Sequence, residues 1–490
     1  MDGHPLTGVP DTGDTAWMLI SATLVLLMTP GLAFFYGGMV RVKSVLNMIM
    51  MSVTAMGVVT VLWVLYGYSV AFGDDVGNVM GRPSDYWGLK GLIGVNAVPA
   101  GPDGGAAAVQ IPIVGTVPEN VFVAFQLMFA IITVALISGA VADRMKFGSW
   151  LMFAALWVSI VYFPVAHWVF AFDGATAAHG GWIANKLHAI DFAGGTAVHI
   201  NAGTAALVLA IMLGRRRGWP MAMRPHNLPL VMLGAALLWF GWYGFNAGSA
   251  VSANGVAGST FLTTTIAAAA AMLGWLLAER IRDGHATSLG AASGIVAGLV
   301  GITPACASVN VVGALAIGAV SGIACALAVG LKYRFGLDDS LDVVGVHLVG
   351  GVVGTVLVGF LAAPATAAIA GGSGVSPGLL YSGGAQQLWR QIIGACSVAA
   401  YSAIGTVIVA WIVKLTVGLR VDAEAEASGI DEALHAESGY DFAVAASPVS
   451  THFAEERREY EADHRDREAV HVGGNQDRVG AGGPAGHDGQ

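Results

Sequence analysis

Long apolar segments recur along most of this chain, and they constrain its fold more than any other feature. A helix needs about 20 apolar residues to cross the hydrocarbon core of a bilayer. Eleven apolar runs of about that length occur within the first 418 residues, centred on residues 16–39, 45–72, 121–141, 147–170, 196–214, 228–250, 261–278, 290–302, 309–331, 343–363 and 392–415. Only 11% of the residues are charged, against about 25% in soluble domains. The sequence therefore predicts an all-α integral membrane protein with eleven transmembrane helices, of which the eighth run, 290–302, is the shortest.

Basic residues between the runs predict which side of the membrane each end occupies. Fourteen fall on one face and four on the other, and positive charge accumulates on the cytoplasmic side. The fourteen are Arg41, Lys43, Arg144, Lys146, Arg215, Arg216, Arg217, Arg224, Arg280, Arg282, Lys332, Arg334, Lys414 and Arg420. We therefore expect the N-terminus outside, the C-terminus in the cytoplasm, and a location in the inner (plasma) membrane. The first run follows acidic rather than basic residues, which favours a true span over a cleaved signal peptide.

Composition divides the chain into three parts. Residues 1–418 are the predicted membrane domain, in which 73–120, rich in glycine and proline, form an external loop. Residues 419–490 hold 16 of the 32 acidic residues but 6 of the 23 basic ones. We divide this acidic part into a cytoplasmic tail, 419–446, and an extension, 447–490, whose composition is typical of disorder.

Two apolar runs open with the same pair of residues. Asp191 precedes His199 by eight positions, and Asp339 precedes His347 by the same eight. The surrounding letters are alike, "VHINAG" and "VHLVGG". Because the second pair lies five spans later, it starts from the opposite face, which indicates an inverted 5+5 repeat of the kind found in transporters.

The histidines are the ionisable residues placed most clearly inside spans, where such groups usually face a partner or a cavity. One buried histidine alone is more often structural, but two at repeat-related positions favour a path for a small polar molecule. Asp191 has two open interpretations, namely capping of the fifth span's first N–H groups or attraction of a cation. The cysteines, Cys306, Cys325 and Cys396, lie in apolar settings without metal-ligand spacing and are expected to be packing residues. No nucleophile motif accompanies the histidines, so the sequence predicts neither an enzyme nor a metal or other cofactor, and no nucleic-acid partner.

Small residues also repeat within the eighth run. Gly290, Gly294 and Gly298 form two overlapping small-xxx-small motifs, a pattern that permits close approach of helix backbones in membranes. We expect tight packing of this run against a neighbouring helix.

Several longer motifs together resemble the Amt/Mep/Rh ammonium transporters, in particular the bacterial Amt type. They are "MTPGLAFFYGGMVR", "FQLMFAIITVALISGA", "DFAGGTAVHINAG", "LLWFGWYGFNAGSA", "DDSLDVVGVHLVGGVVGT" and "GLRVDAEAEASGIDEALHAESGYDF", which reach to about Phe442. The resemblance implies nitrogen uptake by a homotrimer whose subunits each have a pore, built from spans one to five and six to ten.

The resemblance also implies roles for individual residues. An outer vestibule would recruit ammonium or methylammonium through Phe129, Phe170 and Ser249, and Asp191 would act as an architectural or electrostatic element. Stacked Phe129 and Phe245 would close the entrance, and the lumen would be lined by Trp242, His199 and His347. Residues 419–442 match the family's docking element for PII-type nitrogen regulatory proteins, with a solvated tail lacking a partner as the alternative.

One position departs from the family pattern. Where tryptophan is most common, this chain has Phe170, which keeps a π face but attracts a cation less strongly. Trp168, two positions earlier, is expected to anchor at the lipid interface instead. Two other functions remain as alternatives: a membrane-bound ammonium sensor, which would carry a signalling domain, and an Rh-type gas channel, which would have a less polar entrance.

Overall fold

The computed structural model describes residues 4–96, 110–366 and 374–440. The chain divides into a large unit, Met1–Glu437, and a short one, Ser438–Gln490, and the fold described below is that of the first. The predicted extension 447–490 and the central part of the loop 73–120 lie outside the described residues.

Within the described residues, ten helices are long and apolar enough to cross a membrane. Their regular parts are α1 (Thr12–Met39), α2 (Val45–Leu62) with α3 (Tyr68–Phe72), α4 (Glu119–Val141), α5 (Phe147–Trp157) with α6 (Phe163–Phe170), α7 (Asn201–Leu213), α8 (Leu228–Gly248), α9 (Gly255–Asp283), α11 (Val311–Phe335), α12 (Val349–Leu361) and α14 (Gln386–Thr416). The eighth apolar run forms a shorter helix, α10 (Ser288–Ile302), of 15 residues. Ten of the eleven expected helices thus have spanning length, and the eleventh span stays a prediction.

Side-chain caps define several helix starts. Asn254 accepts hydrogen bonds from the N–H groups of Val256 and Ala257 at the start of α9. Asn310 accepts one from Gly313 at the start of α11. Such caps satisfy N–H groups that lack partners within the helix, so polar residues at the ends of apolar runs fix where these helices begin.

The glycines of α10 pack against α9, as their spacing predicts. A Cβ atom at Gly294 would lie 2.8 Å from the Trp275 Cβ, and one at Gly298 would lie 2.5 Å from the Ala271 Cβ. Larger side chains would therefore force the two helices apart. The small-xxx-small pattern is confirmed as a close helix contact.

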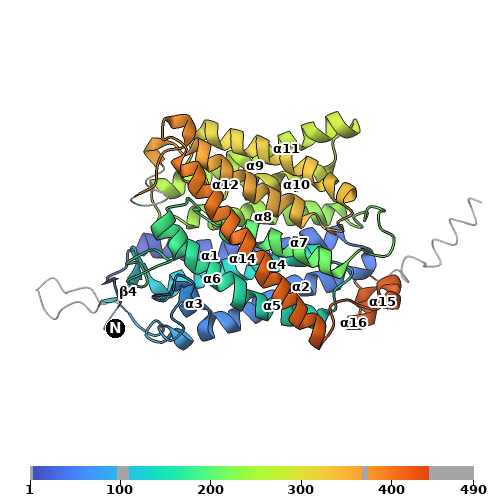
Figure 1. Ribbon diagram of the computed structural model, residues 1–490, viewed down its shortest axis with the longest axis horizontal. Coiled ribbons are helices and arrows are strands. Elements are labelled where there is room, and N and C mark those ends of the chain that lie inside the picture. Colours follow the sequence, from blue (N-terminus) through green and yellow to red (C-terminus); the bar gives the residue numbers. More distant parts are fainter. Residues whose placement is uncertain (1–3, 97–109, 367–373, 441–490) are drawn as a thin grey trace, which may run out of the picture. The chain divides into compact units, whose positions relative to one another are not determined.

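The helices lie roughly side by side, and α14 runs obliquely across α5, α7 and α12 (Figure 1). Two short antiparallel sheets lie at one end of the bundle. One has the strand order β1 (Thr7–Gly8), β4 (Ile111–Val114), β5 (Val117–Pro118), with Thr7 opposite Pro112, and the other pairs β2 (Asp75–Val76) with β3 (Met80–Gly81). We call this end the strand end.

The tail folds back against the opposite end, which we call the tail end. It contains two short helices, α15 (Ala423–Ser428) and α16 (Ile430–His435). The Asp431 carboxylate accepts hydrogen bonds from the backbone N–H groups of Leu46 and Asn47, at 3.0 and 2.8 Å, at the start of α2. A carboxylate here also interacts favourably with the helix dipole, so the acidic tail is attached to the membrane domain by specific contacts.

Candidate functional site

His199 and His347, the histidines of the two similar motifs, lie against each other inside the bundle. The Nδ1 atoms of His199 and His347 are 3.3 Å apart, and the rings are nearly parallel, with centroids separated by 5.3 Å. Both residues are almost fully buried, at 1% and 3% exposure. Since one Nδ1 must donate and the other accept, the pair holds complementary tautomers. Among the described atoms, His199 Nε2 has no hydrogen-bond partner, which leaves it available to a small molecule.

Each histidine lies in a π-helical segment. His199 belongs to Gly195–Ile200, which leads into α7, and His347 belongs to Val344–Leu348, which leads into α12. Short π-helical turns inside α-helices are rare and frequently occur at functional sites. The two sequence motifs therefore share their backbone geometry, although π-helical segments also occur at Trp63–Gly67, Val158–Tyr162 and Ile183–Leu187.

Asp191 caps the first of these segments. Its carboxylate accepts hydrogen bonds from four backbone N–H groups and one hydroxyl, namely those of Gly194 (2.8 Å), Gly195 (2.6 Å), Thr196 (2.8 Å), Ala197 (3.2 Å) and the Thr196 side chain. The residue is 9% exposed. Of its two interpretations, capping is the one the geometry displays, whereas attraction of a cation stays a prediction.

Asp339 caps the second segment in the same way. It accepts hydrogen bonds from the N–H groups of Val343 (3.1 Å) and Val344 (2.7 Å). Burial, followed by repulsion from Asp342, raises the pKa of Asp339 to about 6, while the Lys332 ammonium acts in the opposite direction. An aspartate thus fixes the start of both histidine-bearing segments.

A glycine one turn after each histidine contacts the other segment. A Cβ atom at Gly203 would lie 2.4 Å from the backbone nitrogen of Leu348, and one at Gly351 would lie 3.1 Å from the His199 Cβ. Gly203 therefore has no room for a Cβ atom beside the Leu348 backbone, and at Gly351 a Cβ atom would make a tight contact. The two histidine-bearing segments thus contact each other at both glycines.

Aromatic rings extend the histidine pair toward the strand end. Trp242 stacks on His199 at 5.5 Å, and its indole N–H donates to Thr303 Oγ1 at 3.0 Å. Phe245 lies beside Trp242 and stacks on Phe129, with ring centroids 4.3 Å apart. A cavity of about 10 Å³ between these groups and the histidines is close to the smallest volume that holds one water molecule. Its size suits a ligand as small as ammonia or water.

A second cavity, of about 100 Å³, lies on the far side of the Phe129–Phe245 stack. Phe129, Phe170 and Ser249 all line it, as the resemblance implies. Further lining residues that the sequence interpretation missed are Phe72, Phe122, Phe125, Gln126, Phe172, Thr176 and Phe192. The spacing of Phe122, Phe125 and Phe129 on one helical face was a usable signal for part of this set.

Trp168 does not reach the lipid interface, so that expectation is wrong. It is 7% exposed, its indole N–H donates to the Val79 carbonyl at 2.8 Å, and its ring packs against Trp182 and Tyr401. Trp168 is covered by the loop that carries β3 and by the helix α14.

The cysteines also differ among themselves, because Cys306 and Cys325 are buried whereas Cys396 is exposed.

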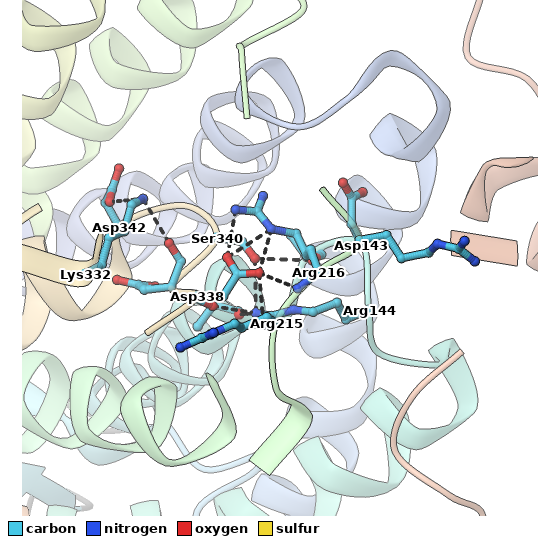
Figure 2. A network of polar contacts seen from close by, with 12 residues as sticks. Asp143, Arg144, Arg215, Arg216, Lys332, Asp338, Ser340 and Asp342 are labelled. Carbon is cyan, nitrogen blue, oxygen red and sulfur yellow. Dashed lines mark hydrogen bonds and ion pairs between the residues drawn. The ribbon is translucent and has the colours of Figure 1, made fainter. Parts of the chain in front are cut away.

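A charged cluster that the sequence did not predict lies near the tail end (Figure 2). Asp338 binds the Arg216 guanidinium at 2.7 Å, and the fully buried Arg144 lies 3.5 Å away. Arg144 also donates to Ser340 Oγ at 3.1 Å. Burial opposes ionisation of Asp338, but the hydrogen bonds from Arg216 and the charge of Arg144 hold its pKa below the ordinary value. Burial lowers the pKa of Arg144 to about 10. The cluster joins the loops before α5, α8 and α12.

Comparison with known proteins agrees with this architecture. Residues 16–440 match the model of the Ammonium Transporter Family. An ammonium transporter of Mycobacterium tuberculosis is 76% identical over 450 residues, covering 92% of this chain and 94% of the relative. One from Aquifex aeolicus is 48% identical, covering 88% and 94%.

Solved structures show the same fold. The crystal structure of Saccharomyces cerevisiae Mep2 superposes with a TM-score of 0.73 at 35% identity, over 84% of this chain and 88% of that one. A structure described as a sensor Amt protein gives 0.74 at 28% identity, over 86% and 98%. With its apolar helices of spanning length and these relatives, the chain is a multi-pass membrane protein that belongs to the ammonium transporter family.

Proposed function

We propose that the chain recruits ammonium in the vestibule lined by Phe129, Phe170 and Ser249, where the cation loses its proton to water, and conducts ammonia past His199 and His347. The observation that carries this proposal is the buried contact of the two imidazoles, one of which has an unpartnered nitrogen beside a cavity of about 10 Å³. Family membership supports ammonium as the transported species.

The energies favour conduction of the neutral molecule. Burial of an unpaired cation in a low-dielectric pore has an idealised cost on the order of 20 kcal/mol. Removal of the proton from an amine that titrates two to three units above neutral costs roughly 3 to 4 kcal/mol at pH 7. Potassium and sodium cannot lower their charge in this way, so the same pore would exclude them.

The Phe129–Phe245 stack would act as the entrance. Both rings are 1% exposed and lie between the two cavities, so the stack would separate water in the vestibule from the histidines. A cation held against Phe129 and Phe170 would gain cation–π attraction. Asp191, held by five donors, would keep the His199 segment in place and add negative charge to the strand side of the pore.

The quaternary and cellular setting is proposed by analogy with the family. We propose a homotrimer in the plasma membrane with eleven spans in an inverted 5+5 arrangement, the strand end outside and the tail end in the cytoplasm. The basic residues near the tail end, among them Arg144 and Arg216, support this orientation. The attached tail helices α15 and α16 support docking of a PII-type regulator at that end.

Flux into liposomes tests the pore assignment. His199→Ala removes one partner of the imidazole pair and leaves His347 Nδ1 without its contact. We expect about ten-fold slower ammonium flux or loss of selectivity over potassium, since an unpaired buried polar group costs about 1–3 kcal/mol. His347→Ala should behave similarly because the contact is mutual. If His199→Ala matches the parent in rate and selectivity, the pore role is refuted. Recording with and without a membrane potential distinguishes net charge transfer from neutral transport.

A further inference from the structure

A third histidine is buried near the strand end, apart from the histidine pair described above. His167 lies on α6, three residues before Phe170, and it is 0% exposed. Its Nδ1 lies 3.1 Å from the Ala71 carbonyl oxygen, and its Nε2 lies 3.1 Å from the Asp75 Oδ1. Neither of the two cavities described above is lined by His167. The side chain therefore lies behind the wall of the vestibule and does not touch the proposed path of ammonium.

Both partners of His167 are hydrogen-bond acceptors. A backbone carbonyl can only accept, and an ionised carboxylate also has no proton to donate. The second oxygen of Asp75 accepts from the Asn78 N–H at 3.0 Å, so both of its oxygens act as acceptors. A neutral imidazole carries one N–H group, whereas the imidazolium carries two. The arrangement therefore suits a charged imidazole that donates from both nitrogens, and a buried charge is tolerated when it is paired and hydrogen-bonded in this way.

The end of a neighbouring span also favours a positive charge at this position. The span Val42–Phe72, of which α3 is the last part, ends beside α6. The last carbonyl groups of a helix lack partners within it, and the helix dipole stabilises a cation near them. The Phe72 carbonyl accepts from the Thr176 hydroxyl at 2.7 Å, and the Ala71 carbonyl faces His167. An imidazolium would therefore complete the cap at the end of this span.

The other titratable groups around α6 have no hydrogen bond or ion pair with His167 within the described residues. On the surrounding elements and loops these groups are Tyr68, Asp74, Arg82, Asp85, Tyr162, Asp173, His179, Lys186, His199 and Tyr401. Asp74, the neighbour of Asp75 in the chain, pairs with His179 at 3.2 Å and with Arg82 at 3.5 Å. Among the described residues, the charge that pairs directly with the buried imidazole is that of Asp75.

The imidazole connects two walls of the vestibule. Phe72 directly follows the Ala71 carbonyl, and Phe170 lies one turn after His167 on the same helix. Both phenyl rings line the cavity of about 100 Å³, and so does Thr176, which binds the Phe72 carbonyl. His167 therefore joins the element that carries Phe72 to the element that carries Phe170.

We propose that His167 is a positioning residue of the ammonium vestibule, and that its imidazolium form couples recruitment of the cation to pH. Histidine is the side chain that ordinarily changes charge between about pH 5 and pH 8. Loss of the Nε2 proton would leave a lone pair facing the Asp75 carboxylate, and this contact would be lost. The vestibule walls are therefore held together at lower pH and less firmly as the pH rises. The proposal rests on the proposed function, because it takes the cavity beside Phe170 as the recruitment site.

Solid-state nitrogen NMR of the full chain in lipid tests the charge of His167 without a transport measurement. The 13 histidines are labelled with nitrogen-15, and the difference between the spectra of the parent and His167→Gln isolates one signal. We expect two protonated ring nitrogens at about pH 6 in the parent. Asp75→Asn should leave one, because its amide group can donate to the bare nitrogen. If His167→Gln does not fold, the histidine signal that changes in Asp75→Asn identifies the residue. A single protonated nitrogen in the parent would overturn the proposal.

Uptake of methylammonium into liposomes tests the coupling, because an amine stays charged between about pH 5 and pH 8. The half-saturating concentration of the parent should rise about five-fold over this range, the equivalent of about 1 kcal/mol or one net hydrogen bond. His167→Gln should have the higher value throughout the range, with a maximal rate similar to that of the parent. Equal pH dependence of this concentration in the two proteins, or none in the parent, would overturn the proposal.

Two further variants complete the experiment. His179→Gln is the matched control and should behave as the parent, because this exposed histidine pairs with Asp74 instead. Phe170→Trp separates the role of His167 from the proposed function. If Phe170→Trp changes the half-saturating concentration and His167→Gln does not, the vestibule assignment stands and the role of His167 is refuted. If neither variant changes it, the vestibule assignment itself is refuted.

Discussion

Phe170 places a phenyl ring at the proposed ammonium site, where the sequence resemblance implies an indole in most members of the family. Its ring meets Phe129 edge to face, with centroids 6.4 Å apart, and it is 8% exposed. A phenyl face attracts a cation less strongly than an indole face. Within the proposed mechanism, this side chain affects recruitment of the cation rather than conduction beyond the Phe129–Phe245 stack.

Phe170→Trp should therefore strengthen recruitment. A gain of about 0.5–1 kcal/mol in cation–π attraction corresponds to a two- to five-fold lower half-saturating ammonium concentration, with a similar maximal rate. Concentration-dependent current or flux in liposomes measures both quantities. Phe240→Trp, on an exposed face of α8, is the control. An unchanged half-saturating concentration for Phe170→Trp would contradict a cation contact at this position.

Residues within motifs were predictable, but contacts between distant loops were not. His199, His347, Phe129 and Phe245 come from motifs whose letters are local, and the structure brings all four together. The ion pair of Arg144 with Asp338 joins residues 194 positions apart. Nothing in the local sequence of a loop states which other loop supplies its counter-charge.

The crossing of the two histidine-bearing elements depends on close backbone approach. Gly203 on α7 lies against Leu348, and Gly351 on α12 lies against the Cβ atom of His199. Contact at Gly203 is the tighter, because its Cβ would lie 2.4 Å from the Leu348 nitrogen, whereas one at Gly351 would lie 3.1 Å from the Gly195 carbonyl oxygen and the His199 Cβ. The two positions therefore differ in how much added volume they tolerate.

Gly203→Ala should separate the imidazoles and slow ammonium flux more than Gly351→Ala does. Forced overpacking of this kind typically costs 1–3 kcal/mol, so we also expect a lower melting temperature for Gly203→Ala. Flux per incorporated protein and thermal unfolding in detergent measure the two effects. Equal flux in both variants would mean that this contact does not set the imidazole separation.

Hydropathy predicted the positions of the helices, but it did not predict the π-helical segments within them. The apolar runs match the helices because lipid-facing and buried positions are both apolar, so the signal is strong all along a span. For the same reason no periodic pattern distinguishes the π-helical part of Gly195–Leu213 from its α-helical part. The eighth run falls short of spanning length because the chain turns at Thr303–Ser308 after α10.

At the scale of the molecule, the tail contacts several cytoplasm-side loops of the proposed topology. Glu426 binds Arg420 at 2.7 Å and accepts from the Arg217 N–H at 2.6 Å, while Arg41 donates to the Glu426 carbonyl at 3.1 Å. Arg216, next to Arg217, belongs to the Asp338 cluster. Contacts thus continue from the tail to the loop that precedes the His347 segment.

Removal of residues 419–490 should abolish co-elution of a PII-type protein, because it removes the proposed docking segment. It should also lower the melting temperature, because the contacts of Arg217 and Arg420 with Glu426 are lost. Size-exclusion chromatography and thermal unfolding measure these outcomes. Removal of 447–490 alone is the control and should leave both unchanged, since it retains the contacts of α15 and α16. Unaltered PII binding after the longer deletion would favour a tail without a partner.

The π-helical segments Gly195–Ile200 and Val344–Leu348 also determine the rotational phase of the spans that contain them. In an α-helix each residue advances the direction of its side chain by about 100°, and a π-helical turn holds roughly one residue more than an α-helical one. Gly203 and Gly351 follow these π-helical turns in the chain. Each of them faces the opposing segment in a helix whose preceding turn contains the extra residue. Loss of a single residue from Gly195–Ile200 or Val344–Leu348 would turn the rest of the span by about a quarter of a revolution. Sequence length in these short stretches is therefore constrained as strictly as the identity of the histidines.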